Sequence, residues 1–161
     1  MKPTEIAKEF LRAQPEIFSL GNAEVDRLRL VVDDVTDHAK FLAFNQTLNG
    51  IDVFNGQVKF TLNKDGEVIQ VATGDVVPGL NISTTPRLTP EEVVKAAFVG
   101  IGSEPPGSLS TAPGTSGKIA FLNPRGNGYN PITVELSIFP MTAAAARLAY
   151  RIFLEDDPKS W

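Results

Sequence analysis

Few residues of this 161-residue chain are of the types that carry out acid–base, nucleophilic or metal chemistry. His38 is the only histidine, and the chain contains no cysteine. Asp33-Asp34 and Asp156-Asp157 are carboxylate pairs, but neighbours on an extended strand point to opposite faces, so neither pair predicts an acid–base dyad. We therefore expect no metal site, no cofactor and no enzyme activity in this chain.

Charge and hydropathy argue against two further classes of partner. The chain has 15 basic and 19 acidic residues, for a net charge of −4. Nucleic acids and anionic membranes are bound by clustered basic residues, so we expect neither partner. No apolar run reaches the roughly 18 residues of a membrane span. The N-terminal sequence MKPTEIAKEF also lacks the apolar centre of a signal peptide.

The stretch NQTLNGIDVFNG, residues 45–56, contains Asn-Gly twice, and this dipeptide is a strong β-hairpin signal. Apolar residues occupy even positions up to 48, odd positions at 51 and 53, and even positions again from 58 to 62. One extra residue within Phe54-Asn55-Gly56 would explain the change of phase. We interpret Asn49-Gly50 as a turn, and the second Asn-Gly as a β-bulge in which Gly56 has a positive φ.

Pairing across these turns predicts a meander. The first turn places Leu48 opposite Ile51 and Gln46 opposite Val53. A second turn at Asp65-Gly66 places Leu62 opposite Ile69, Phe60 opposite Val71 and Lys64 opposite Glu67. The expected strands are residues 26–32, 39–48, 51–62 and 67–72.

Two helices are also readable. Apolar residues at positions 6, 7, 10 and 11 have helical spacing, which Pro15 ends. Thr89, Pro90 and Glu92 form the start of a second helix with a capping box. A Pro-, Gly- and Ser-rich loop (102–117) follows, and then strands at 118–122, 132–138 and 147–154. The sequence thus predicts an α+β fold of two helix-plus-antiparallel-sheet modules, residues 1–85 and 86–161, with a seam at 75–88.

Two triplets fit the N-glycosylation sequon, Asn45-Gln46-Thr47 and Asn81-Ile82-Ser83, although such triplets also arise by chance. Gln46 falls on the apolar face of its strand. We expect its amide to be satisfied by backbone groups at the edge of the core.

The sequence of residues 38–74, HAKFLAFNQTLNGIDVFNGQVKFTLNKDGEVIQVATG, resembles the fungalysin/thermolysin propeptide (FTP) motif. That family has a His, an aromatic or apolar strand, a Gln, an Asn-Gly-Ile-x-Val turn and strand, and an Asp-Gly hairpin. Asp52 stands where the family often has Pro. The positions that match the family are His38, Phe44, Gln46, Asn49, Gly50, Ile51, Val53, Phe54, Asn55, Asp65 and Gly66.

The resemblance implies the N-terminal prosegment of a secreted, fungalysin-like zinc metalloprotease, acting as intramolecular chaperone and inhibitor. Its partner would be the cognate catalytic domain, which lies outside these residues and would hold the zinc. The first module, residues 1–85, would contain a cystatin-like meander. Residues 86–161 would be a second, PepSY-like propeptide module, truncated before its closing strand. We expect the exposed loops 102–117 and 123–131 to reach the protease, with Arg125 and Tyr129 as candidate contacts.

Two other classes of function remain open. The chain could be a stand-alone cystatin-like module that binds a ligand or protein on its sheet. It could also be a small enzyme, which would need a polar cluster of His38, Asp37 and Asp33 in a pocket.

Overall fold

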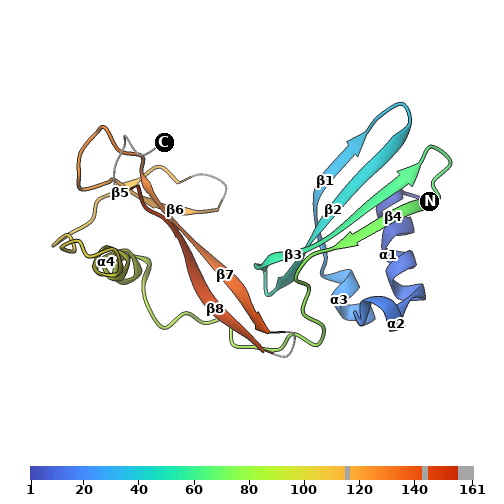
Figure 1. Cartoon of the computed structure of the whole chain (residues 1–161), viewed down its shortest axis with the longest axis horizontal. Helices are drawn as coiled ribbons and strands as arrows, with labels where there is room; N and C mark the ends of the chain where they lie inside the picture. The colour runs from blue at the N-terminus through green and yellow to red at the C-terminus, as the bar shows by residue number, and fades with distance from the viewer. Residues whose placement is uncertain (115–116, 143–144, 156–161) are drawn as a thin grey trace. The chain divides into compact units, whose positions relative to one another are not determined.

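The computed structural model describes residues 1–114, 117–142 and 145–155. The chain divides into two compact units, Met1–Thr84 with Ile138–Leu148, and Thr85–Ser137 with Ala149–Trp161. Each unit contains helix and mostly antiparallel strands (Figure 1), so the predicted α+β class is confirmed. That residues 86–161 form a separate PepSY-like module stays a prediction.

The first unit is built on an antiparallel meander in which each strand pairs with the next. Its strands are β1 (Arg29–Val35), β2 (Ala39–Leu48), β3 (Ile51–Asn63) and β4 (Val68–Thr73). Three helices precede the meander and pack on one of its faces (Figure 1). They are α1 (Pro3–Ala13), α2 (Pro15–Phe18) and α3 (Asn22–Asp26).

The core between helices and sheet follows from the alternation of side chains along β2 and β3. Phe44 and Phe60 are fully buried, and their rings meet edge to face with centroids 6.1 Å apart. Phe10 from α1 meets the ring of Phe60 at 6.3 Å in the same way. Aromatic pairs of this geometry add about 0.5–1.5 kcal/mol beyond the area they bury.

The predicted bulge in β3 is confirmed, but it is larger than one residue. Asn45 pairs with Gln57 and Thr47 with Asp52, so residues 53–56 of β3 lie opposite Gln46 alone. The expected pairing of Gln46 with Val53 is therefore wrong, because the register breaks between them.

Positive φ in the bulge belongs to Asn55 (57°), whereas the prediction had assigned it to Gly56. Asn tolerates the left-handed region better than most residues. Gly56 is needed for a different reason, since a Cβ on it would lie 2.7 Å from the Cβ of Val53.

The β3–β4 turn also differs from its predicted form. Phe60 pairs with Val71 as expected, but Leu62 pairs with Val68 instead of Ile69. The loop has three residues, 64–66, and is closed by the N–H of Asn63 donating to Glu67 O at 2.9 Å. Gly66 has φ 89°, as a three-residue hairpin with a glycine bulge requires.

In consequence the carboxylate of Glu67 accepts a bond from Asn63 Nδ2 at 2.7 Å, and the expected pairing of Lys64 with Glu67 is wrong.

The predicted boundaries of two elements near the N-terminus need correction as well. Pro15 begins α2 in addition to ending α1, because proline is well suited to the first helical position. Residues 22–26 form α3, so β1 starts at Arg29 instead of Asp26.

The second unit contains α4 (Pro90–Gly100), β5 (Thr111–Ala112) and β6 (Ile119–Phe121). It shares the hairpin strands β7 (Ile132–Thr142) and β8 (Ala145–Phe153) with the first unit. The predicted capping box is confirmed, because Thr89 N–H donates to Glu92 Oε2 at 2.7 Å and Glu92 N–H to Thr89 Oγ1 at 3.3 Å. The bond from the Thr89 N–H, and a second one from the Thr89 hydroxyl to Glu92 Oε2 at 2.9 Å, lower the pKa of the Glu92 carboxyl. Strand β5, inside the loop 102–117, was not predicted.

We predict that Gly56→Ala destabilises the protein by about 1–3 kcal/mol, because the added methyl group overlaps the side chain of Val53. The control is Gly100→Ala in α4, where a Cβ meets nothing within 4 Å, and we expect no loss there. Denaturant unfolding measures both variants. A Gly56→Ala variant as stable as the parent would show that the close approach at the bulge is not needed.

Candidate functional site

A buried amide joins the sheet of the first unit to the segment that follows it. Gln46 on β2 is 3% exposed. Its Nε2 donates to Val77 O at 2.7 Å, and its Oε1 accepts from Val77 N–H at 2.8 Å. The side chain thus pairs with one residue's backbone as a neighbouring strand would. The expectation that backbone groups satisfy this amide is confirmed.

The same segment, residues 74–84, is held at both ends. At its start, Gly74 N–H donates to Gln57 O at 2.8 Å, and Asp75 N–H donates to Asn55 O at 3.0 Å. A Cβ on Gly74 would lie 2.2 Å from Asn55 O, so only glycine permits this approach. At its end, Asn49 Nδ2 donates to Thr84 Oγ1 at 3.0 Å.

A second core lies beneath this segment. Its buried members come from the ends of β2 and β3, from the segment and from β7, and they are Leu48, Val53, Val77, Leu80 and Ile138. Beside them the ring of Phe54 stacks on Phe139, with centroids 5.5 Å apart and planes 28° apart. The bulge therefore places Val53 and Phe54 where they contact both the segment and the second half of β7.

A polar network beside the bulge joins the three strands β1, β2 and β3. Arg29 on β1 forms an ion pair with Asp52 on β3, and its Nε also donates to Asp52 Oδ1 at 3.3 Å. Asn45 Nδ2 donates to Asp52 Oδ2 at 2.8 Å, and Gln57 Nε2 donates to Asn45 Oδ1 at 2.9 Å. Asp52, which occupies the position where the family often has Pro, therefore accepts bonds from side chains on both β1 and β2.

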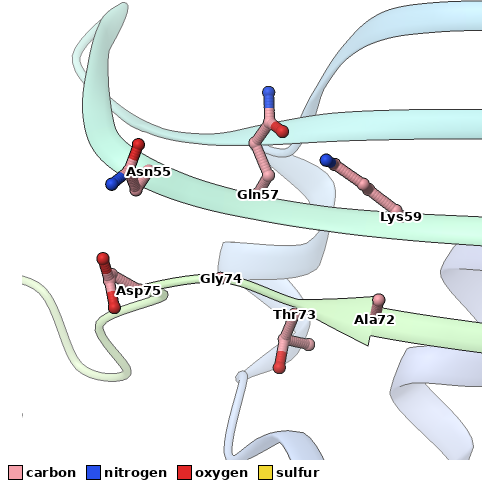
Figure 2. Close-up of a pocket in the computed structure, with 7 residues that line it drawn as sticks. All are labelled: Asn55, Gln57, Lys59, Ala72, Thr73, Gly74 and Asp75. Carbon is pink, nitrogen blue, oxygen red and sulfur yellow. The ribbon is translucent and has the colours of Figure 1, made fainter.

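An open depression of about 330 Å³ lies where β4 ends beside β3 (Figure 2). Figure 2 shows Gln57 and Lys59 side by side on β3, with Asn55 and Asp75 at the end where β4 leads into the segment. The lining holds one ammonium group and one carboxylate, and these groups suit polar contacts but supply no acid–base pair. It is formed by Asn55, Gln57, Lys59, Ala72, Thr73, Gly74 and Asp75.

The residues considered for an enzyme site do not form one. His38, Asp37 and Asp33 are exposed at or near the β1–β2 turn. In residues 1–114, 117–142 and 145–155, no group of three or more His, Cys, Asp or Glu side chains is placed to hold a metal ion. The pair Asp156-Asp157 lies outside the described residues.

Most of the expected motif positions have a structural role in the sheet. Asn49 and Gly50 have φ of 50° and 80° and form the β2–β3 turn, as predicted, with Leu48 opposite Ile51. Asp65 lies in the β3–β4 loop, where its N–H donates to Asn63 Oδ1 at 3.0 Å. Phe44, Gln46 and Val53 are buried, whereas His38 is exposed.

Arg125 and Tyr129 lie in the second unit and are both half-buried. The guanidinium of Arg125 stands 5.3 Å from the ring centroid of Phe98 in α4, and its Nη2 donates to Ser103 Oγ at 2.8 Å. Arg125 thus joins the turn 123–131 to the end of α4. Contact of either residue with a protease stays a prediction.

Glu155 is a buried carboxylate that sequence analysis did not single out. Its Oε2 accepts bonds from Asn130 N at 2.6 Å and Nδ2 at 3.0 Å, and Asn123 Nδ2 donates to its backbone O at 3.3 Å. These bonds join the chain just after β8 to the turn 123–131. In sequence Glu155 heads an acidic run, which ordinarily predicts a solvated surface.

Most residues that line the depression lie on β3 and β4, and these strands belong to a stretch that matches a known family. Residues 30–73 match the Fungalysin/Thermolysin Propeptide Motif. The FTP motif indicates a propeptide of fungalysin/thermolysin-type metalloproteases, which are secreted, and such propeptides associate with their catalytic domains. No curated protein matches the chain. Among the helices described, none is long and apolar enough to cross a membrane.

We predict that Gln46→Leu destabilises the protein by about 2–4 kcal/mol, because it leaves the buried N–H and C=O of Val77 without partners. The control is Gln70→Leu, the same change at an exposed position of β4, for which we expect an effect within about 0.5 kcal/mol. Denaturant unfolding compares the two variants. Equal, small losses would contradict the role given to the buried amide.

Gln46→Glu tests the same bonds through pH. A carboxylate can accept from Val77 N–H but cannot donate to Val77 O, and burial raises the pKa of the introduced acid. The protonated acid restores the donor. The stability deficit relative to the parent should therefore be smallest at acidic pH and grow as pH rises through the raised pKa.

Proposed function

We propose that this chain is the prosegment of a secreted, fungalysin-like zinc metalloprotease, that it assists folding of the catalytic domain, and that it inhibits that domain until processing. The observation that supports this most is the match of residues 30–73, which covers all of the β1–β4 meander except Arg29. The zinc would belong to the catalytic domain, because the single histidine of this chain cannot supply a two-histidine zinc helix.

The internal contacts of the first unit suit a folding template. Its sheet, the buried Gln46 amide and the network around Asp52 hold the backbone in one arrangement before any partner binds. A surface that is ordered in advance loses little conformational entropy on docking, so more of the contact energy contributes to affinity.

Loops 102–117 and 123–131 of the second unit are our candidates for contact with the protease. Arg125 is already oriented by Phe98 and Ser103, and Tyr129, in the same turn, is half-buried. Arg and Tyr side chains are common at the centres of interfaces.

Titration of the mature protease with this chain, read with a peptide substrate, tests the proposal. We expect inhibition at micromolar or lower chain concentration, and a higher yield when the denatured catalytic domain is refolded with the chain. Tyr129→Ala should weaken inhibition by roughly tenfold, the size of a modest interface hot spot. The exposed Val99→Ala in α4 is the control.

If the chain neither inhibits nor improves refolding at tens of micromolar, the prosegment proposal is wrong. The stand-alone binding module would then take its place. The depression at Asn55–Asp75 is the feature that such a module would use.

A further inference from the structure

The structure separates the two N-glycosylation sequons of the sequence. Asn45 lies within β2 and is half-buried, with its Nδ2 donating to Asp52 Oδ2 at 2.8 Å and its Oδ1 accepting from Gln57 Nε2 at 2.9 Å. Asn81 is exposed and lies in a stretch that is neither helix nor strand. The folded chain therefore presents one acceptor amide to solvent and engages the other in the sheet.

The burial pattern around Asn81 explains why it faces outward. Leu80 is buried and Ile82 is partly buried, and both pack in the second core with Val77. The two residues that define the sequon are exposed. Asn81 lies between Leu80 and Ile82, and Ser83 follows Ile82. In an extended chain alternate side chains point in opposite directions. The apolar residues therefore anchor the stretch while the sequon residues point outward.

We propose that Asn81 accepts an N-linked glycan when the chain passes through a eukaryotic secretory pathway, and that the folded, secreted protein carries none at Asn45. The sequon is the chemical signal and the exposed side chain is the structural one. The proposal rests on the proposed function in one respect, namely that the parent protein is secreted.

The co-reactant is a lipid-pyrophosphate-linked oligosaccharide. A C–N bond forms between Asn81 Nδ2 and the anomeric carbon of its first sugar, and the bond from that carbon to the pyrophosphate oxygen breaks. The bonding electrons leave with the lipid pyrophosphate, and Nδ2 loses one proton to a base of the transferase. No oxidant or reductant is involved.

Asn45 is the natural comparison because transfer takes place on chains that have not finished folding, so burial does not itself prevent modification. Burial of Asn45 matters after the transfer, when the chain folds. A sugar on Asn45 Nδ2 would displace Asp52 Oδ2 from the amide and disturb the ion pair of Asp52 with Arg29. We therefore expect chains modified at Asn45 to fold poorly and to be retained in the cell.

The experiment is secretion of the full chain, behind a cleavable signal, from eukaryotic cells. Secreted protein is deglycosylated enzymatically in heavy-oxygen water, and the peptides containing Asn45 and Asn81 are examined by mass spectrometry. We expect the isotope label on Asn81 in most molecules and on Asn45 in almost none. Asn81→Gln should abolish the glycosidase-sensitive shift in mobility. The matched control is Asn127→Gln, an exposed asparagine outside any sequon, which should not change the shift.

Secreted protein without a glycan at Asn81, or folded protein with one at Asn45, would overturn the proposal. The readout is glycan occupancy and involves no protease. Loss of the inhibitory function would therefore leave this result unchanged, and an empty Asn81 would leave the proposed function standing.

Discussion

The first unit depends on one buried pairing, that of the Gln46 side chain with both backbone groups of Val77. The segment after β4 has no strand partner at that point, and a buried backbone residue without partners costs about 1–3 kcal/mol for each polar group. Gln46 removes this cost while its aliphatic stem stays within the apolar face of β2. The second core can then form beneath the segment, with Val77 and Leu80 packed on Val53.

The shape of β3 follows from the same constraint. The bulge at residues 53–56 changes the phase of the strand, so that Val53 faces the second core while Val58 and Phe60 face the helices. Asn55 accepts the left-handed backbone conformation, and Gly56 leaves room for Val53. A family motif of turns, an amide and aromatic residues is thus a set of requirements of one fold.

Features fixed by neighbouring residues could be predicted from the sequence. The Asn49-Gly50 turn, the Thr89 capping box and the phase change in β3 each depend on a few adjacent side chains. Features that join distant residues could not. Sequence reasoning found that Gln46 needs a backbone partner, but not that Val77, 31 residues away, provides it. Likewise the partners of Glu155 lie 25 or more residues earlier, so its burial had no local signal.

We propose above that this chain is made as part of a metalloprotease precursor. Immunopurification of the newly synthesised protein with an antibody against the folded chain, followed by peptide mass spectrometry, tests it directly. We expect one polypeptide that contains both this sequence and a catalytic domain with a two-histidine zinc helix, and that separates into two products on maturation. A chain that accumulates from the outset as an independent product, with no protease sequence attached, would contradict it.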